Sequence, residues 1–113
     1  MKITEQSKGT VIVVGLHGSW MGEQESAAFQ EKKFQLLEAN KVNIVLDLAE
    51  LSIIDSSGLG NLISALVPTR NKGGDIRLAQ VNKHVQHVIK VVQLERIFKI
   101  FATVDEAVAS FGK

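Results

Sequence analysis

The sequence predicts an α/β protein with a mixed, mostly parallel sheet, and three observations support this prediction. Helix-like and strand-like segments alternate from residue 25 onward, which is typical of parallel strands joined by right-handed crossovers. Two strand-like segments with a glycine turn between them open the chain and indicate an N-terminal hairpin. The length of 113 residues, with 45% apolar and 22% charged residues, suits one globular domain over residues 1–113.

The strands are expected at five places, beginning with the hairpin of residues 2–7 and 10–16 around Gly9. The run VIVVGL in the second segment is rich in β-branched residues, as expected of a strand covered on both faces. The segment VNIVLDL, residues 42–48, has the same character, and IRLAQV follows the turn NKGGD. RIFKIF, residues 96–101, is expected to form a short strand.

Four amphipathic helices are expected to cover the sheet, and the first runs from about Glu25 to Asn40. Pro68 removes a hydrogen bond from the second helix, which is therefore expected to kink or to end early. The apolar positions expected to face the core are, helix by helix, Ala27, Phe34 and Leu37; Leu59, Leu62, Ile63 and Leu66; Val85, Val88, Ile89 and Val92; and Val104, Ala107, Val108 and Phe111.

Composition excludes several classes of function. The formal charge of +1 lacks the basic excess of a nucleic-acid-binding domain. There is no cysteine, so thiol catalysis and disulfides are excluded. The first ten residues lack a hydrophobic signal core, and the apolar runs are shorter than the roughly 20 residues of a membrane span. We expect a soluble cytoplasmic protein without membrane contact.

The stretch DSSGLG, residues 55–60, lies between a strand region and a helix, at the sheet edge where α/β proteins bind ligands. Asp55, Ser56 and Ser57 suit a helix N-cap. Capping does not explain Gly58 and Gly60, because each glycine costs about 1 kcal/mol relative to alanine in a helix. Bare backbone would let another molecule approach closely.

The same stretch fits poorly to a nucleotide site or a catalytic nucleophile. Ile63 occupies the third small position of a dinucleotide fingerprint, and no P-loop lysine is present. Neither serine has the glycine two residues earlier that a nucleophile elbow requires. His84 and His87 lack a third ligand nearby and are expected to be solvated. We therefore predict no catalytic residues, no metal site and no cofactor.

A serine at an exposed helix start can itself be a substrate. Phosphorylation adds about −1.5 to −2 charges, which a helix N-terminus tolerates. Beside Asp55, a phosphate on Ser56 would create a dense negative spot that repels a partner. If the four predicted core positions of this helix are buried, the small residues Ser57, Gly58, Asn61, Ser64 and Ala65 face outward and offer a docking strip.

The segment IVLDLAELSIIDSSGLGNLISAL, with the following GGDIRLAQVNKHVQHVIKVVQLERIFKIFATVDEAVASF, closely resembles the STAS-domain anti-sigma factor antagonists of bacteria. The resemblance covers roughly residues 10–111. It implies a mixed sheet covered by helices and a role in partner switching without catalytic activity. The phosphoacceptor that it implies is Ser56, within a motif formed by Asp55, Ser57 and Gly58.

In that family the unphosphorylated antagonist binds an anti-sigma factor, which is a serine kinase of the histidine-kinase-like ATPase type, and so releases the sigma factor. The kinase phosphorylates the antagonist, which then dissociates, and a serine phosphatase resets it. The resemblance implies these partners for this chain.

The loop GLHGSWMGEQ departs from the family pattern and contains Trp20, the only tryptophan. Either Trp20 folds over the edge of the core, or it is an exposed anchor for a partner. Two other functions stay open. One is a STAS module that docks statically in a stress-sensing or membrane transport assembly, and the other is a nucleotide-binding or small-ligand-binding domain.

Overall fold

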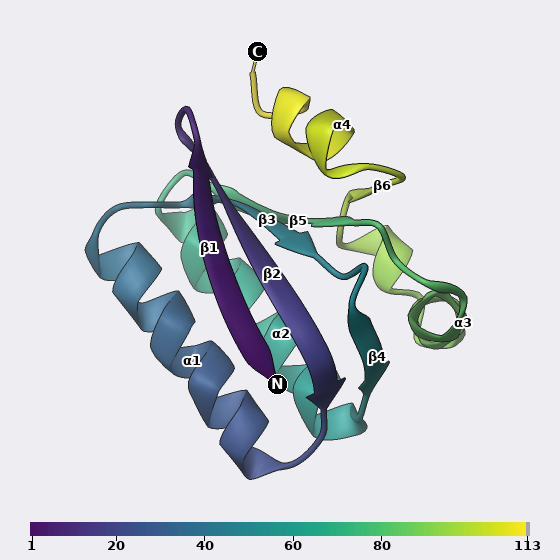
Figure 1. Ribbon diagram of the computed structural model, residues 1–113. Helices are drawn as coiled ribbons and strands as arrows, with labels where there is room; N and C mark the ends of the chain where they lie inside the picture. Colours follow the sequence, from purple (N-terminus) through teal and green to yellow (C-terminus); the bar gives the residue numbers. More distant parts are fainter. Residues whose placement is uncertain (113) are drawn as a thin grey trace.

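The computed structural model describes residues 1–112 and has the mixed α/β architecture that the sequence predicts (Figure 1). Its elements, in chain order, are β1 Lys2–Lys8, β2 Val11–Trp20, α1 Glu23–Glu38, β3 Asn43–Asp47, β4 Leu51–Ile54, α2 Ser56–Asn71, β5 Asp75–Ala79, α3 Lys83–Val91, the 3-10 helix η1 Leu94–Arg96, β6 Ile100–Phe101 and α4 Val104–Ala109.

The strands form a sheet in the order β1-β2-β3-β5-β6. β1 and β2 form the antiparallel hairpin, with Lys8 opposite Val11 across the turn at Gly9. The pairs β2–β3, β3–β5 and β5–β6 are parallel. β4 lies off this path and pairs in parallel with the last residues of β2, from Gly18 to Trp20. The mixed, mostly parallel sheet is thus confirmed.

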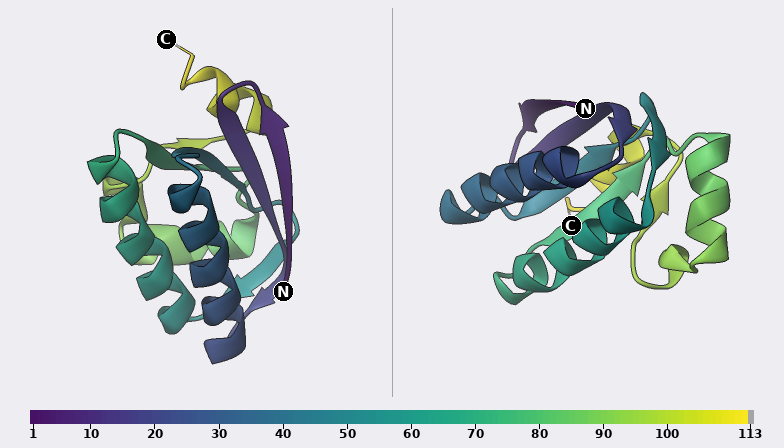
Figure 2. Two further views of the ribbon diagram at one scale, coloured as in Figure 1. Left: turned by 90° about the vertical axis from the view of Figure 1, so that its left-hand side faces the viewer. Right: turned by 90° about the horizontal axis from the view of Figure 1, so that it is seen from below.

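Helices cover both faces of this sheet, as the apolar run in β2 predicts. Alternate residues of β2 point to opposite faces: Ile12 and Val14 join the large core under α1, α2 and α3, whereas Val11 and Val13 join a smaller cluster with α4. α1 and α2 run side by side in both views of the helical layer (Figures 1 and 2).

Several expectations about the elements are wrong. β4 was not expected as a separate strand. RIFKIF is mostly not a strand, because Arg96 ends η1, residues 97–99 form a turn and an irregular stretch, and only Ile100 and Phe101 are paired. α2 does not end early at Pro68 but continues to Asn71. The residue freed of its helical hydrogen bond by Pro68 is Ser64, which is exposed, so water can satisfy its carbonyl group.

The expected core stripes are also partly wrong. Ala27 and Phe34 were expected to be buried in α1, yet both are exposed, because the helix packs through Phe29 and Leu36 instead. Val92 ends α3 as its exposed C-cap, and Ile63 is exposed on α2.

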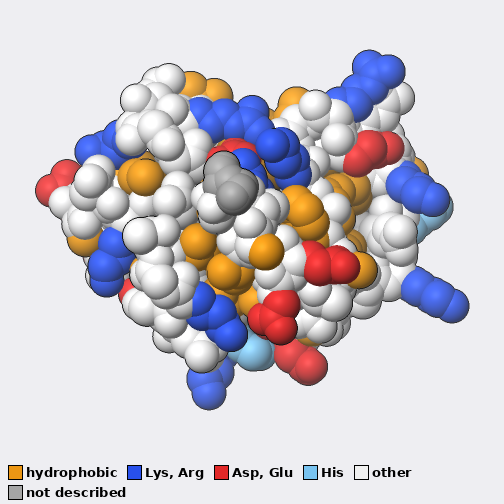
Figure 3. All heavy atoms as spheres, turned by 90° about the horizontal axis from the view of Figure 1, so that it is seen from above, with side chains coloured by type: hydrophobic (Ala, Val, Ile, Leu, Met, Phe, Trp, Pro, Cys, Tyr) orange, Lys and Arg blue, Asp and Glu red, His pale blue; other side chains and the backbone are white. Residues whose placement is uncertain are grey.

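Within residues 1–112 no helix is long and apolar enough to cross a membrane. The end of the molecule near α4 is shown in Figure 3, where acidic side chains lie among the lysine and arginine side chains.

Candidate functional site

Ser56 is the first residue of α2 and is exposed to solvent. Its position is fixed by Asp55, the N-cap residue, which follows the last residue of β4. The backbone of Asp55 is extended, and its side chain caps the first turn of α2. The Oδ1 atom of Asp55 accepts a hydrogen bond of 2.7 Å from the backbone amide of Gly58. The sequence therefore places a hydroxyl group at an accessible, firmly capped helix start.

Asp55 also joins α2 to the loop between β2 and α1. Its Oδ2 atom accepts a hydrogen bond of 2.9 Å from the amide of Gly22, and its own amide donates to the carbonyl oxygen of Trp20 at 3.0 Å. The amides of Gly58 and Gly22 stabilise the carboxylate and lower the pKa of Asp55 below its usual value. Asp55 is thus a charged clamp immediately beside Ser56.

Gly58 is buried, so the expectation that it faces outward is wrong. A Cβ atom at this position would lie 2.8 Å from Cγ1 of Ile54 and 2.9 Å from Cδ1 of Trp20. The helix start therefore needs glycine here because β4 and the indole ring pack directly against it.

Trp20 is fully buried, with 0% of its surface exposed. Its Nε1 atom donates a hydrogen bond of 3.1 Å to Oγ of Ser26, and the centroids of its ring and the Phe29 ring are 4.6 Å apart. Of the two interpretations of Trp20, burial at the core edge is correct, and an exposed partner anchor is wrong. Its packing on Gly58 makes it part of the support beneath the Ser56 site.

The docking strip expected on α2 is only partly exposed. Ala65 is fully buried, because the helix turns this residue toward the sheet, so the expectation that it faces a partner is wrong. Ser57 and Ser64 are exposed. Asn61 is half-buried and tied within the fold, donating from Nδ2 to the carbonyl oxygen of Ser57 at 2.8 Å and accepting from Gln30 of α1.

The exposed surface around Ser56 contains residues that sequence analysis did not assign to it. On α2, Gly60, Ile63 and Val67 follow Ser56 at helical spacing, and Ile63 and Val67 are 39% and 62% exposed. Met21, also exposed, lies between the two residues whose backbones bond to Asp55. We call the exposed residues Met21, Ser56, Ser57, Gly60, Ile63 and Val67 the Ser56 face.

The sequence contains only a weak signal for the Ser56 face. Ile63 fits the apolar spacing of Leu59, Leu62 and Leu66, so periodicity alone places it in the core. The informative signal is Gly60. Apart from its chain neighbours and the backbone of its own helix, no atom of the described residues lies within 4 Å of its Cβ position. Packing among residues 1–112 therefore does not account for glycine at this position.

The described residues contain no cluster of metal-ligating side chains. In residues 1–112 no group of three histidine, cysteine or acidic side chains could hold a metal ion. His84 and His87 are exposed, as expected. The geometry at Ser56 suits modification of its hydroxyl group and contact with another protein, because the site combines an accessible oxygen, a fixed carboxylate and exposed apolar side chains.

Comparison with known proteins agrees with this description. The family model described as the STAS domain matches residues 2–107. A Thermotoga neapolitana protein, provisionally named an anti-sigma factor antagonist, is 36% identical over 64 residues. That match spans 57% of this chain and 57% of the relative, so the aligned part covers little more than half the relative's length.

Solved structures have the same fold. A Thermotoga maritima crystal structure, also of a provisionally named anti-sigma factor antagonist, gives a TM-score of 0.88 at 24% identity, covering 98% of this chain and 95% of the other. The Bacillus cell fate determinant SpoIIAA in its phosphorylated form gives 0.76 at 18% identity, covering 97% and 99%. With the family model matching nearly the whole sequence, the chain belongs to the STAS domain family.

Proposed function

We propose that this protein is an anti-sigma factor antagonist whose binding is switched off by phosphorylation of Ser56. The unphosphorylated chain binds an anti-sigma factor serine kinase of the histidine-kinase-like ATPase type, which then releases its sigma factor. The kinase transfers phosphate to Ser56, and a serine phosphatase removes it. In this proposal the chain is a cytoplasmic binding module and a kinase substrate, and it is not itself an enzyme.

The observation that carries the proposal is the position of Ser56, exposed at the start of α2 beside the clamped carboxylate of Asp55. A kinase can reach the hydroxyl group without opening the fold. The relatives support the same role, because one is provisionally named an anti-sigma factor antagonist. Another protein with this fold, the anti-sigma factor antagonist SpoIIAA, has been solved in unphosphorylated and phosphorylated forms.

The Ser56 face provides the contact that the phosphate would disrupt. Its apolar members Ile63 and Val67 supply surface to bury against the kinase, while Gly60 leaves room for close approach. A phosphate at Ser56 adds about two negative charges beside Asp55, at the edge of this contact. Shifting a complex from 99% bound to 1% bound requires about 5.5 kcal/mol of differential affinity, and a dianion desolvated at an interface can contribute much of this.

The experiment is to measure binding of the purified cognate kinase to Ser56 variants by calorimetry. We expect Ser56→Ala to bind like the wild type but to resist phosphorylation, and Ser56→Asp to bind at least tenfold more weakly. Ser57→Ala is the matched control, because Ser57 is also exposed in the first turn, and it should remain a substrate. If Ser56→Asp binds as tightly as the wild type, the switch is refuted.

A second pair of variants tests the surface. Gly60→Leu places a bulky side chain in the centre of the Ser56 face, and we expect it to weaken kinase binding at least tenfold. Asn71→Leu adds the same side chain at the exposed far end of α2 and should leave affinity unchanged. Equal affinities for both variants would remove the Ser56 face from the interface. Co-purification with transport subunits instead of a kinase would favour a static docking module.

A further inference from the structure

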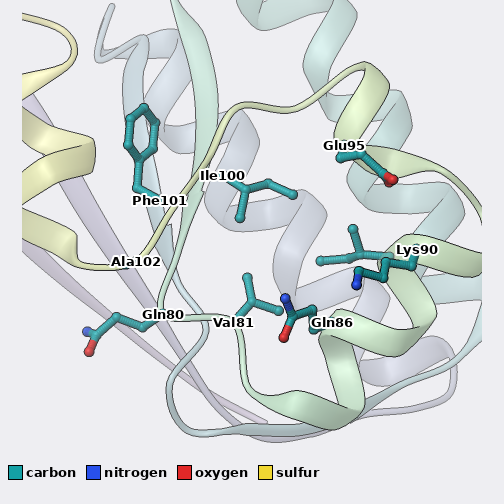
Figure 4. A pocket seen from close by; sticks show the side chains of 9 residues that line it. Gln80, Val81, Gln86, Lys90, Glu95, Ile100, Phe101 and Ala102 are labelled. Atoms are coloured by element: carbon teal, nitrogen blue, oxygen red, sulfur yellow. The ribbon is translucent and has the colours of Figure 1, made fainter.

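A cavity lies away from Ser56, between α3, η1 and β6 (Figure 4). Its volume is about 540 Å³, which is within the range of small-molecule pockets. It opens beside the carboxyl ends of β5 and β6, the edge at which parallel sheets bind their ligands. Nothing in the proposed partner switch uses this cavity.

The floor of the cavity is apolar. Val81, from the loop after β5, and Ile100, from β6, face each other across the hollow in Figure 4, and Ile89 of α3 contributes a third apolar side chain. Gln80 also borders the cavity, but its side chain turns away and donates a hydrogen bond to Asp47 at 3.2 Å. An apolar group of a ligand would displace water from this floor.

Three polar side chains border the same hollow: Gln86 and Lys90 from α3 and Glu95 from η1. Lys90 and Glu95 take part in none of the ion pairs formed within residues 1–112. A ligand with one net charge would be attracted by one of these two groups and repelled by the other. A ligand that carries both charges would be attracted by both.

We infer that this cavity binds a small zwitterionic peptide with apolar side chains, about the size of a dipeptide. Lys90 pairs with the peptide carboxylate and Glu95 with its ammonium group. The carboxamide of Gln86 can both donate to and accept from the peptide bond. Val81, Ile89 and Ile100 pack against the apolar side chains.

The test is a titration of the isotopically labelled chain with L-leucyl-L-leucine, followed by backbone amide spectra. We expect saturable shifts confined to α3, η1, β6 and the loop before α3. Blocking the ligand carboxylate as an amide should weaken binding two- to fivefold, the range for a solvent-exposed ion pair, but should have no effect in Lys90→Gln. Acetylating the amino group of the ligand should likewise weaken binding to the wild type two- to fivefold. It should have no effect on binding to Glu95→Gln.

Lys72→Gln and Glu38→Gln are the matched controls, because both residues are exposed and neither lines the cavity. In both control variants, amidation and acetylation of the peptide should each weaken binding as much as they do in the wild type. Absence of shifts at the cavity up to the solubility of the peptide would overturn the inference. Equal binding of the free, amidated and acetylated peptides would also overturn it.

Discussion

Gly58 and Gly60 lie two residues apart at the start of α2, yet their surroundings differ completely. A Cβ atom on Gly58 would lie within 3.0 Å of side-chain atoms of Ile54 and Trp20, whereas a Cβ atom on Gly60 would meet open space. The sequence could show only that both residues are poor helix formers. The structure assigns Gly58 to packing and leaves Gly60 available for contact with another molecule.

This difference predicts opposite effects of the same substitution. Gly58→Ala forces Cβ into buried neighbours, and the cost of overpacking exceeds the gain in helix propensity, so we expect a loss of about 1–2 kcal/mol in stability. Gly60→Ala meets no neighbour and should gain about 0.5–1 kcal/mol. Urea unfolding of both variants measures the difference, and equal effects would contradict the assigned roles.

The carboxylate of Asp55 makes part of the fold's stability dependent on pH. Its pKa is lowered in the folded state, chiefly by the hydrogen bonds from the amides of Gly58 and Gly22. The ionised Asp55 carboxylate therefore makes its full contribution to the free energy of unfolding when the pH is above its unfolded-state pKa of about 3.9. This contribution is lost as the pH falls below that pKa and through the lowered folded-state pKa.

We expect Asp55→Asn to lower the melting temperature at pH 7. Its melting temperature should then fall less than that of the wild type as the pH drops below the unfolded-state pKa of Asp55. Asp105→Asn is the matched control, because Asp105 is an exposed aspartate in the first turn of α4. Melting curves recorded from pH 7 to about pH 3 test this. An unchanged acid dependence in Asp55→Asn would show that the clamp does not contribute.

At the scale of elements, α2 is the helix that the sequence described least well. Periodicity predicted its existence and its buried Leu62 and Leu66, which is correct. It could not predict that Pro68 would be accommodated, because tertiary packing of the flanking Ala65 and Thr69 holds the helix together beyond the proline. Thr69 also donates a hydrogen bond to the carbonyl oxygen of Ala65 at 2.8 Å.

Pro68 therefore carries a cost that the fold tolerates. We expect Pro68→Ala to restore the missing helical hydrogen bond to Ser64 and to raise the free energy of unfolding by up to about 3 kcal/mol. Chemical denaturation measures this change. A destabilised variant would mean that the proline ring makes packing contacts worth more than the hydrogen bond.

Other elements show the same limit of sequence reasoning. The strands buried on both faces are recognisable because their apolar runs are continuous, and β3 and β5 appear close to the expected residues. β4 was missed because four residues beside a capped helix carry no clear period, and its pairing with the end of β2 is a tertiary contact. The orientation of α1 was missed because Phe34 and Phe29 suggest competing apolar faces.

For the whole molecule, the fold separates a rigid support from an exposed site. Trp20, Ile54 and Gly58 form a buried layer beneath the start of α2, and Asp55 joins that layer to the loop before α1. Because Ser56 lies outside this layer, phosphorylation should alter surface charge while the fold persists. The motif DSSG was readable from the sequence, whereas the apolar partners of Ser56 on the same face needed the structure.

The central claim is that Ser56 is a phosphorylation site that controls binding. It is tested most directly by intact mass measurement and peptide mapping of the protein isolated from its native cells across growth and stress conditions. We predict one phosphate, located on Ser56 and removable by a phosphatase. A chain that stays unmodified under all conditions, or that carries its phosphate on Ser57, would contradict the claim.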